Sequence, residues 1–140
     1  MNKIRIMRAE EEWQRAGAYS VRIQGMNRQY HISLREEFDE HDGNESRYIV
    51  LIDDEYPVAT CRFYELTSHC VMIGRVVVLP EYRNQHLGSM VIREAEKWIA
   101  ELGYNDYYDF FELAIRFGKM IKGKIMLKHI KDMDGNFVIM

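Results

Sequence analysis

Residues 76–89 read VVVLPEYRNQHLGS and combine an apolar strand, a polar turn and the start of a helix. The valine run suits a buried strand, and Pro80 ends it because proline cannot donate to a sheet ladder. After the turn, apolar residues recur at steps of three and four, which predicts a helix over 84–102. Gly103 follows, where a glycine commonly ends a helix. The stripe consists of Leu87, Val91, Ala95, Trp98 and Leu102.

The turn between this strand and this helix is a candidate anion site. The first backbone N–H groups of a helix have no acceptor within the helix, and the helix dipole adds partial positive charge there. Pyrophosphate is a natural ligand for such a place, and Gly88 allows the backbone to approach it closely. The pattern alone also fits a capped strand-to-helix turn without a ligand.

The segments before this stretch predict a largely antiparallel sheet. Runs of strand-forming residues at 48–53, 56–64 and 70–80 are separated by short polar turns and predict a three-strand meander. We expect the third and most apolar run to be central. Residues 3–7 alternate like a further short strand. Residues 35–47 are polar and acidic, without a helical stripe, and predict a loop.

Residues 10–26 read as helical, with Trp13, Ala16 or Gly17, Ser20 and Ile23 on one face. Two glycines, Gly17 and Gly25, weaken the pattern, so two short helices fit as well as one.

The segments after Gly103 have weaker patterns of secondary structure. Residues 104–111 suit a strand apart from two aspartates, and residues 112–121 are weakly helical. The tail predicts a hairpin that turns near Asp134–Gly135.

Composition narrows the functional classes. The chain has 140 residues, 47% of them hydrophobic, and a formal net charge of -3. This predicts one domain over 1–140 with its own core. The net charge does not show the basic character that is typical of nucleic-acid binding. No apolar stretch is long enough to cross a membrane. The two cysteines, Cys61 and Cys70, have no metal spacing and fit a reducing cytoplasm, and the first residues do not resemble a secretory signal.

The central stretch resembles the signature of the GCN5-related N-acetyltransferase (GNAT) family. That signature is an apolar strand, often V-x-P, followed by [R/Q]-x-x-G-x-[G/A] at the start of a helix. Val78-Leu79-Pro80 matches the first part, Arg83 begins the second and Gly88 ends it. His86 replaces the usual glycine, although histidine adopts a left-handed conformation more readily than most residues.

The resemblance covers roughly residues 1–104 and is closest to a subgroup of small bacterial acetyltransferases. The further matching segments are VRIQGMNRQYHI (21–32), EEFDEHD (36–42), PVATCR (57–62) and IGRVVV (73–78).

The resemblance implies a single-domain α/β fold with a mixed, mostly antiparallel central sheet flanked by helices, and acetyl-CoA as the acetyl donor. It places the pantetheine arm on the backbone of Val76, Val77 and Val78. It places the pyrophosphate on the turn made of Arg83, Asn84, Gln85, His86, Leu87, Gly88 and Ser89. An amine would enter from the opposite side and attack the thioester directly. A homodimer is compatible with the family.

The catalytic residues stay unassigned at this stage. Many family members have a tyrosine that protonates the departing thiolate, within A-x-x-F-Y-x-K-x-G. This chain has Ala114 and Phe117 but continues with Gly118 in place of that tyrosine. Tyr107 or Tyr108 could replace it, although aromatic packing on the sheet is the simpler interpretation.

The other polar residues have simple structural interpretations. The acidic run over 36–42 suits a solvated loop, or supplies carboxylates that attract a cationic amine. The histidines lack metal spacing, so we expect no metal site, and the cysteines suit small buried residues.

The sequence therefore favours an acetyl-CoA-dependent N-acetyltransferase that acts on a small-molecule amine, with a protein amine as the less favoured acceptor. The alternatives are a CoA-binding protein with lost or weakened transferase activity and an interaction module without a ligand.

Overall fold

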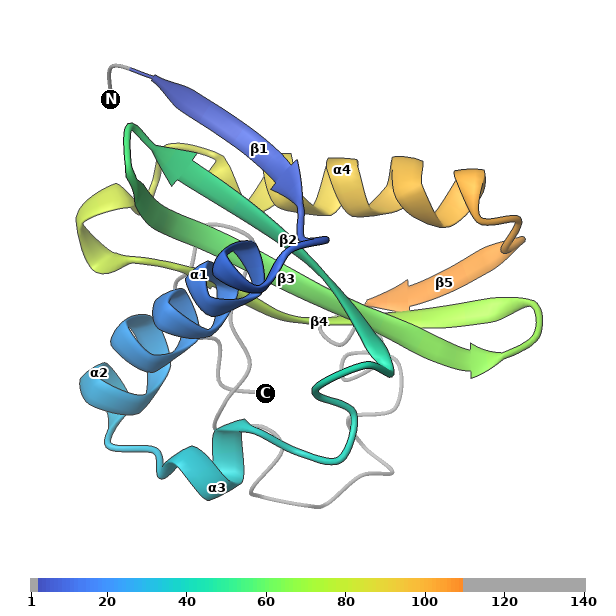
Figure 1. Ribbon diagram of the computed structural model, residues 1–140, viewed down its shortest axis with the longest axis horizontal. Helices are drawn as coiled ribbons and strands as arrows, with labels where there is room; N and C mark the ends of the chain where they lie inside the picture. Colours follow the sequence, from blue (N-terminus) through green and yellow to red (C-terminus); the bar gives the residue numbers. More distant parts are fainter. Residues whose placement is uncertain (1–2, 110–140) are drawn as a thin grey trace.

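The computed structural model describes the backbone of residues 3–109 and the side chains of residues 3–107. Five strands form one sheet, and helices cover its faces (Figure 1). The elements are, in chain order, β1 (Ile4–Arg8), α1 (Glu12–Arg22), the π-helical segment η1 (Ile23–Asn27), α2 (Arg28–Tyr30), α3 (Leu34–Glu37), β2 (Ser46–Asp53), β3 (Tyr56–Thr67), β4 (Cys70–Val78), the 3-10 turn η2 (Pro80–Tyr82), α4 (Leu87–Glu101) and β5 (Asp106–Asp109).

The sheet has the order β1-β2-β3-β4-β5. Neighbouring strands are antiparallel except β4 and β5, which run parallel. The predicted fold class and the three-strand meander are thus confirmed. Within the described sheet, β4 is an inner strand, but β3 takes the middle place that we expected for β4.

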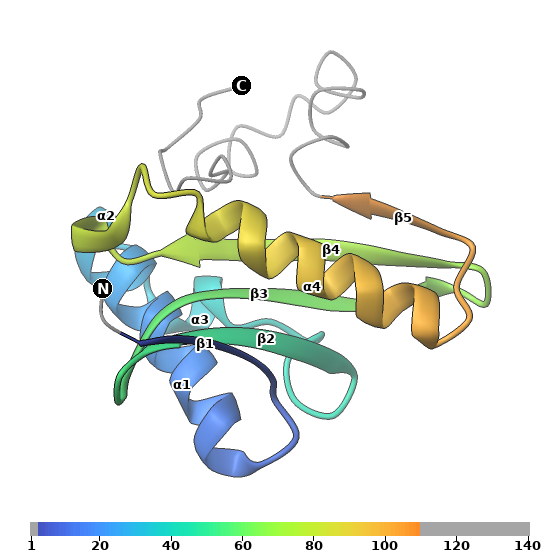
Figure 2. The same cartoon turned by 90° about the horizontal axis from the view of Figure 1, so that it is seen from above.

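Strand β2 is buried on both faces, which explains its nearly continuous apolar sequence. Ile49 and Leu51 belong to the large core cluster that includes the apolar side of α4. Tyr48, Val50 and Ile52 belong to a second cluster with Ala18 of α1. The helix α4 therefore covers one face of the sheet, and α1 covers the other (Figure 2).

The first helical region is continuous, but the face of α1 that the sequence pattern picks out is not the buried one. Trp13 is 54% exposed and its indole nitrogen donates to Glu11 at 2.7 Å, whereas Ala18, Val21 and Arg22 are buried. The burial of Arg22 is made possible by ion pairs rather than by hydrophobicity. A search for apolar positions in the sequence therefore does not find it. The π-helical turn that follows shifts the buried stripe once more.

The acidic segment is also more ordered than we expected. Residues 34–37 form α3, and the hydroxyl of Ser33 accepts a hydrogen bond from the backbone of Glu36 at 3.2 Å. This contact is an ordinary N-terminal cap. The loop therefore occupies only the residues between Phe38 and the start of β2.

Helix α4 confirms the predicted stripe apart from Leu102, which is 39% exposed. It begins at Leu87, because residues 84–86 belong to the preceding turn. At its other end Gly103 has a φ of 93° and donates to the Ala100 carbonyl at 3.0 Å, while Tyr104 donates to Ile99 at 3.3 Å. These two bonds form a Schellman motif, which confirms the predicted glycine end.

The strand predicted over 104–111 is confirmed for Asp106–Asp109, where pairing with β4 outweighs the poor strand preference of aspartate. The predicted helix over 112–121, the tail hairpin and the position of the family tyrosine lie outside the described residues. No helix within the described range has the length and apolar character needed to cross a bilayer.

Candidate functional site

The turn between β4 and α4 contains two residues in the left-handed conformation. Asn84 has a φ of 64° and His86 a φ of 63°. The expectation that His86 can take the glycine position by adopting this conformation is confirmed. Beside the turn, the hydroxyl of Tyr82 donates to Asp53 at 2.8 Å and joins the turn to the end of β2. The hydrogen bond to the Asp53 carboxylate raises the pKa of Tyr82.

Helix α4 begins without a side-chain cap from its N-cap residue, His86. Its first turn also contains no acidic residue, so no carboxylate of that turn offsets the partial positive charge of this end. Gly88 is buried in this turn. The arrangement suits an anion held by backbone N–H groups.

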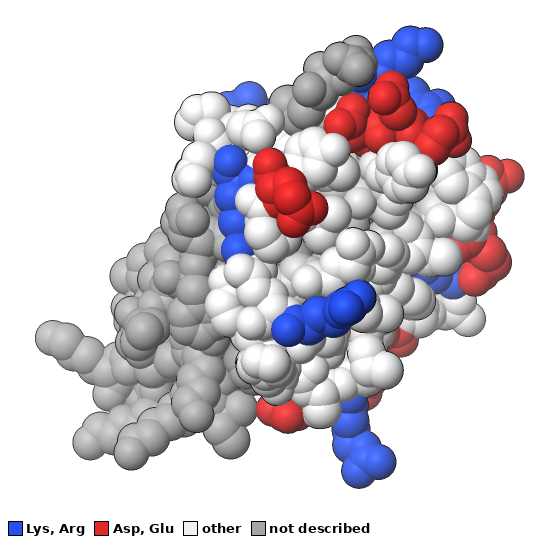
Figure 3. All heavy atoms as spheres, turned by 90° about the vertical axis from the view of Figure 1, so that its left-hand side faces the viewer, with Lys and Arg blue, Asp and Glu red and all other residues white. Residues whose placement is uncertain are grey.

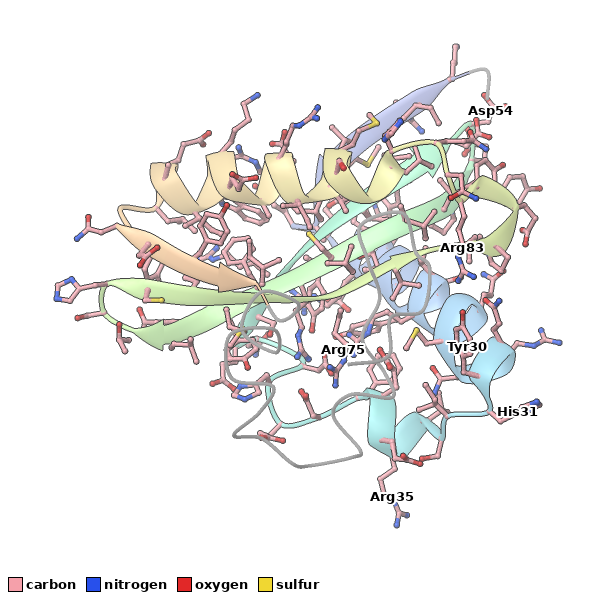
Figure 4. The ribbon with its side chains drawn as sticks, turned by 180° about the vertical axis from the view of Figure 1, so that it is seen from behind. Tyr30, His31, Arg35, Asp54, Arg75 and Arg83 are labelled. Atoms are coloured by element: carbon pink, nitrogen blue, oxygen red, sulfur yellow. The ribbon has the colours of Figure 1, made fainter. Side chains whose placement is uncertain are left out.

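Arg83 holds the turn through its side chain. Its Nε donates to the carbonyl of Val78 at 2.9 Å, and Nη2 donates to the carbonyl of Gly25 at 3.4 Å. Nη1 lies 3.5 Å from the hydroxyl of Tyr30 (Figure 4). The guanidinium thus joins the end of β4 to the π-helical segment, a role that the sequence motif did not indicate.

Gly25 allows the π-helical segment to touch β4. A Cβ atom at this position would lie only 2.5 Å from Cγ1 of Val77. The sequence pattern makes Gly25 a weak point in a helix, but here the missing side chain makes room for the strand. Val77 and Val78 are buried in the core, so only their backbone is available to a ligand.

Strand β4 carries a bulge just before its last residues. Thr60 pairs with Val77 and Arg62 with Gly74, so Cys61 alone lies opposite Arg75 and Val76. Arg75 has a φ of 51°, which is uncommon for a residue with a long side chain. The described pairing with β5 covers only Cys70–Ile73, and the two ribbons diverge toward the described end of β5 (Figure 2).

A cluster of charged side chains lies under this bulge, on the α1 side of the sheet. We call it the arginine–carboxylate cluster; its members are Arg22, Glu37, Asp39, Asp42, Arg62 and Arg75.

The pairs are close and largely shielded from solvent. Arg22 is fully buried and lies 3.0 Å from Glu37 and 2.7 Å from Asp42. Arg62 lies 2.9 Å from Asp39.

The arginines keep these carboxylates ionised. Burial by itself would raise the pKa of Asp42, but the hydrogen bond and the charge of Arg22 outweigh it and hold that pKa well below its usual range. Arg62 likewise outweighs burial and lowers the pKa of Asp39. Burial and the hydrogen bond with Tyr19 raise the pKa of Tyr48, which donates to Asp42 at 2.7 Å.

The interpretation of the acidic run as a solvated loop is therefore wrong for Glu37 and Asp42, which are buried against arginines. Their charges are already compensated within the protein. Only an unusual feature of the sequence, arginine at otherwise apolar positions of a helix and two strands, could have indicated this cluster.

Two further sets of candidates, Tyr107 and the cysteines, lie among the described side chains. Tyr107 packs against the core cluster, as the simpler interpretation expected. Both cysteines are buried and neither is in a disulfide, and burial raises the pKa of the Cys61 thiol. No group of three or more metal-binding side chains is assembled among the described residues.

A polar cavity of about 610 Å³ lies away from the turn. Its walls include Arg47, Tyr64, Trp98 and Tyr104. Trp98 and Tyr104 mark the C-terminal end of α4, whereas the candidate anion site lies at its N-terminal end. None of the residues predicted from the motif lines this cavity.

The end of the molecule that carries the turn and α2 is shown in Figure 3. On this face the charged side chains of both signs are dispersed over a mainly uncharged surface, without one dominant basic patch among the described residues.

Comparison with known proteins agrees with this geometry. The family model of the acetyltransferase (GNAT) family matches residues 7–116. The Bacillus subtilis (strain 168) protein YjcF, an uncharacterized N-acetyltransferase, is 29% identical over 99 residues, which are 71% of this chain and 69% of YjcF.

Solved structures share the fold. A proposed N-acetyltransferase from Lactobacillus plantarum has 29% sequence identity and a TM-score of 0.67, over 74% of this chain and 71% of that one. AAC(6')-Iy in complex with a CoA bisubstrate analogue has 12% identity and a TM-score of 0.57, over 77% of this chain and 79% of that one. From the family match, which spans most of the chain, we conclude that this protein belongs to the acetyltransferase (GNAT) family, whose members take the acetyl group from acetyl-CoA.

Proposed function

We propose that the protein transfers the acetyl group of acetyl-CoA to the amine of a small molecule. The observation that carries this proposal is the start of α4, which has no side-chain cap from His86 and lies directly after the bulged end of β4. Backbone donors at a helix start suit pyrophosphate, and a strand backbone that pairs with a described strand on one side only suits the amides of a pantetheine arm.

Within this proposal the cofactor contacts fall on two backbone segments. Residues 83–89 bind the pyrophosphate, with Gly88 at the closest approach. Residues 76–78 bind the pantetheine arm through backbone groups, because the side chains of Val77 and Val78 are committed to the core. Arg83 holds the two segments in a fixed relative position through its hydrogen bonds to the carbonyls of Val78 and Gly25.

Direct attack of the amine on the thioester requires no covalent intermediate with the protein. The neutral amine attacks the thioester carbon, the C–N bond forms and the C–S bond breaks. The amine nitrogen loses one proton, and the departing sulfur gains one to give the CoA thiol. The protein holds the two reactants together and orients them, which can supply a large share of the rate acceleration. The base and the acid remain unassigned.

Thermal unfolding with and without acetyl-CoA tests the cofactor site, with ATP as the anionic control. A ligand at 100 times its dissociation constant adds about 2.7 kcal/mol, which raises the melting temperature of a domain of this size by several degrees. We expect a shift with acetyl-CoA and none with ATP. The absence of a shift in folded protein would contradict the proposal and favour an interaction module.

Release of CoA thiol in the presence of an amine panel tests transfer itself. Binding of acetyl-CoA without thiol release across a broad panel would favour the second candidate, a CoA-binding protein with weakened transferase activity. The observation behind this candidate is the replacement of the family tyrosine near Phe117 and Gly118.

A further inference from the structure

The bulge of β4 directs an arginine away from α4 and toward the α3 side of the sheet. Arg75 lies between β4 and α3 (Figure 4), where it bonds to the carbonyl of Glu37 and to Asp39. The proposed pyrophosphate site lies at the start of α4, which covers the opposite face. Arg75 is thus on the face opposite the proposed pyrophosphate site, and within the proposed function this is the face from which the amine enters.

The guanidinium of Arg75 has donors to spare. Nε and Nη2 both donate to the Glu37 carbonyl, at 3.1 and 3.0 Å, and Nη2 also reaches Asp39 at 3.1 Å. Nη1 donates to none of the described residues, and the side chain is 23% exposed. The two hydrogens of Nη1 are suited to donate charge-assisted hydrogen bonds to a carboxylate or a phosphate.

Arg75 has no carboxylate of the cluster to itself. The three carboxylates of the cluster are shared among its three arginines: Asp42 is within 3.1 Å of both Arg22 and Arg62, which leaves Arg75 with shared contacts to Glu37 and Asp39. Burial lowers the pKa of Arg75; the charge of Glu37 raises it, and the charges of Arg62 and Arg22 lower it again. An additional negative charge would therefore stabilise this guanidinium.

A polycationic acceptor is not favoured beside this cluster. Glu37, Asp39 and Asp42 are each paired with arginines, so an incoming ammonium group would have to compete with a guanidinium for them.

We propose that Nη1 of Arg75 binds an anionic group of the acceptor, so that the substrate is an amine that also carries a carboxylate or a phosphate. This inference rests on the proposed acetyl transfer and narrows its substrate class. Arg75 would hold the acceptor by its anionic group, and the amine at the other end of the acceptor would face the thioester.

Matched acceptors test the inference directly. We would measure kcat/KM for a series of amino acids, for the corresponding amino acid amides and for aminoalkyl phosphates. A charge-assisted hydrogen bond contributes about 1.5–3 kcal/mol, so we expect the anionic acceptors to be favoured by about 10- to 100-fold. The amino acid and phosphate arms identify which anion is used. Equal kcat/KM for amino acids and their amides would overturn the inference.

Two variants and one control assign the preference to Arg75. R75Q should abolish the preference for anionic acceptors mainly through KM, while R75K, which keeps the charge but loses the planar fork, should retain part of it. R35Q removes an exposed arginine of α3 and should retain all of it. Full preference in folded R75Q would overturn the inference.

A spectroscopic measurement does not depend on turnover or on the stability of a variant. The side-chain Nε–H resonance of Arg75, observed by NMR in arginine-labelled wild-type protein, should shift when an amino acid is added to the acetyl-CoA complex, and should not shift with its amide. No shift with any anionic amine would overturn the inference even if acetyl-CoA binds. Failure of acetyl-CoA to bind would instead overturn the proposed function, and with it this inference.

Discussion

Two glycines of the first helical region differ in how much space their surroundings leave for a Cβ atom. At Gly25 a methyl group would lie 2.5 Å from Cγ1 of Val77, whereas at Gly17 the nearest atom would be 3.4 Å away, at Pro57. Gly25→Ala should therefore lower the free energy of unfolding by about 1–3 kcal/mol, because the strand or the helix must move. Gly17→Ala should be neutral or stabilising by up to about 1 kcal/mol.

Urea denaturation of both variants checks this difference. The double variant G25A/V77A should recover part of the loss, because the smaller alanine side chain at 77 makes room for the new methyl group. Equal stability of the two single variants would show that the helical segment and β4 are not in the close contact described here.

At the residue level, buried charge is what the sequence did not reveal. Gly103 has a local signal, that of a glycine that ends a helix, and the sequence predicted it. Arg22 has none: its ion pairs are made with residues 15 and 20 positions further along the chain. Periodicity identifies apolar faces, so a helix that buries an arginine is assigned the wrong face.

The two ends of helix α4 have different proposed roles, cofactor binding at the start and helix termination at the end. Variants at the two ends should change acetyl-CoA binding and stability separately. Gly88→Val places a branched side chain in the first turn, beside the proposed pyrophosphate. We expect it to weaken acetyl-CoA binding at least about 10-fold, because backbone donors must approach a phosphate closely. Isothermal titration calorimetry measures this, and circular dichroism checks that the fold is kept. Unchanged affinity in folded G88V would show that the site lies elsewhere.

At the other end, Gly103→Ala should affect stability without affecting binding. Gly103 has a φ of 93°, a conformation that alanine adopts at a cost of about 1 kcal/mol or more. We expect a corresponding loss in the free energy of unfolding by urea denaturation, and an unchanged dissociation constant for acetyl-CoA. A loss of binding in G103A would contradict the separation of the two ends.

Among the elements, those with strong local patterns could be predicted. The meander and α4 have clear periods of two and 3.6 residues, and each lies where the sequence indicated. The bulge at Arg75 could not be predicted, because it depends on the register between β3 and β4 rather than on either strand alone. The candidate anion turn could be found because its glycine and proline occur together in a short motif.

At the scale of the whole molecule, the sheet is tied to helices by ion pairs on both faces. On the α4 side, Arg8 of β1 lies 2.8 Å from Glu94 and 2.7 Å from Glu101. On the α1 side, the arginine–carboxylate cluster joins α1, α3, β3, β4 and the loop before β2. The buried cluster should contribute more to acid sensitivity than the two more exposed ion pairs of Arg8, since solvent screens exposed charges.

The cluster predicts a loss of stability in acid. The pKa values of Asp39 and Asp42 are held below their usual range in the folded protein. A carboxyl whose folded pKa is depressed contributes its full stability above the unfolded pKa of about 3.9, and loses it as the pH falls through the folded value. The free energy of unfolding should therefore decrease steadily as the pH is lowered from about 5 toward the folded pKa values of these carboxyls.

The variant D42N makes this prediction specific to the cluster. Near pH 7 it should lower the free energy of unfolding by up to about 3–5 kcal/mol, because Arg22 loses one of its two buried partners. The difference from the wild type should shrink as the pH falls, since protonation removes the same charge from the wild-type protein. E55Q, which removes an exposed carboxylate in the turn between β2 and β3, should match the wild type at every pH. If the D42N difference were the same near pH 7 and in acid, loss of packing rather than loss of charge would explain it, and the cluster would not be the source of the acid sensitivity.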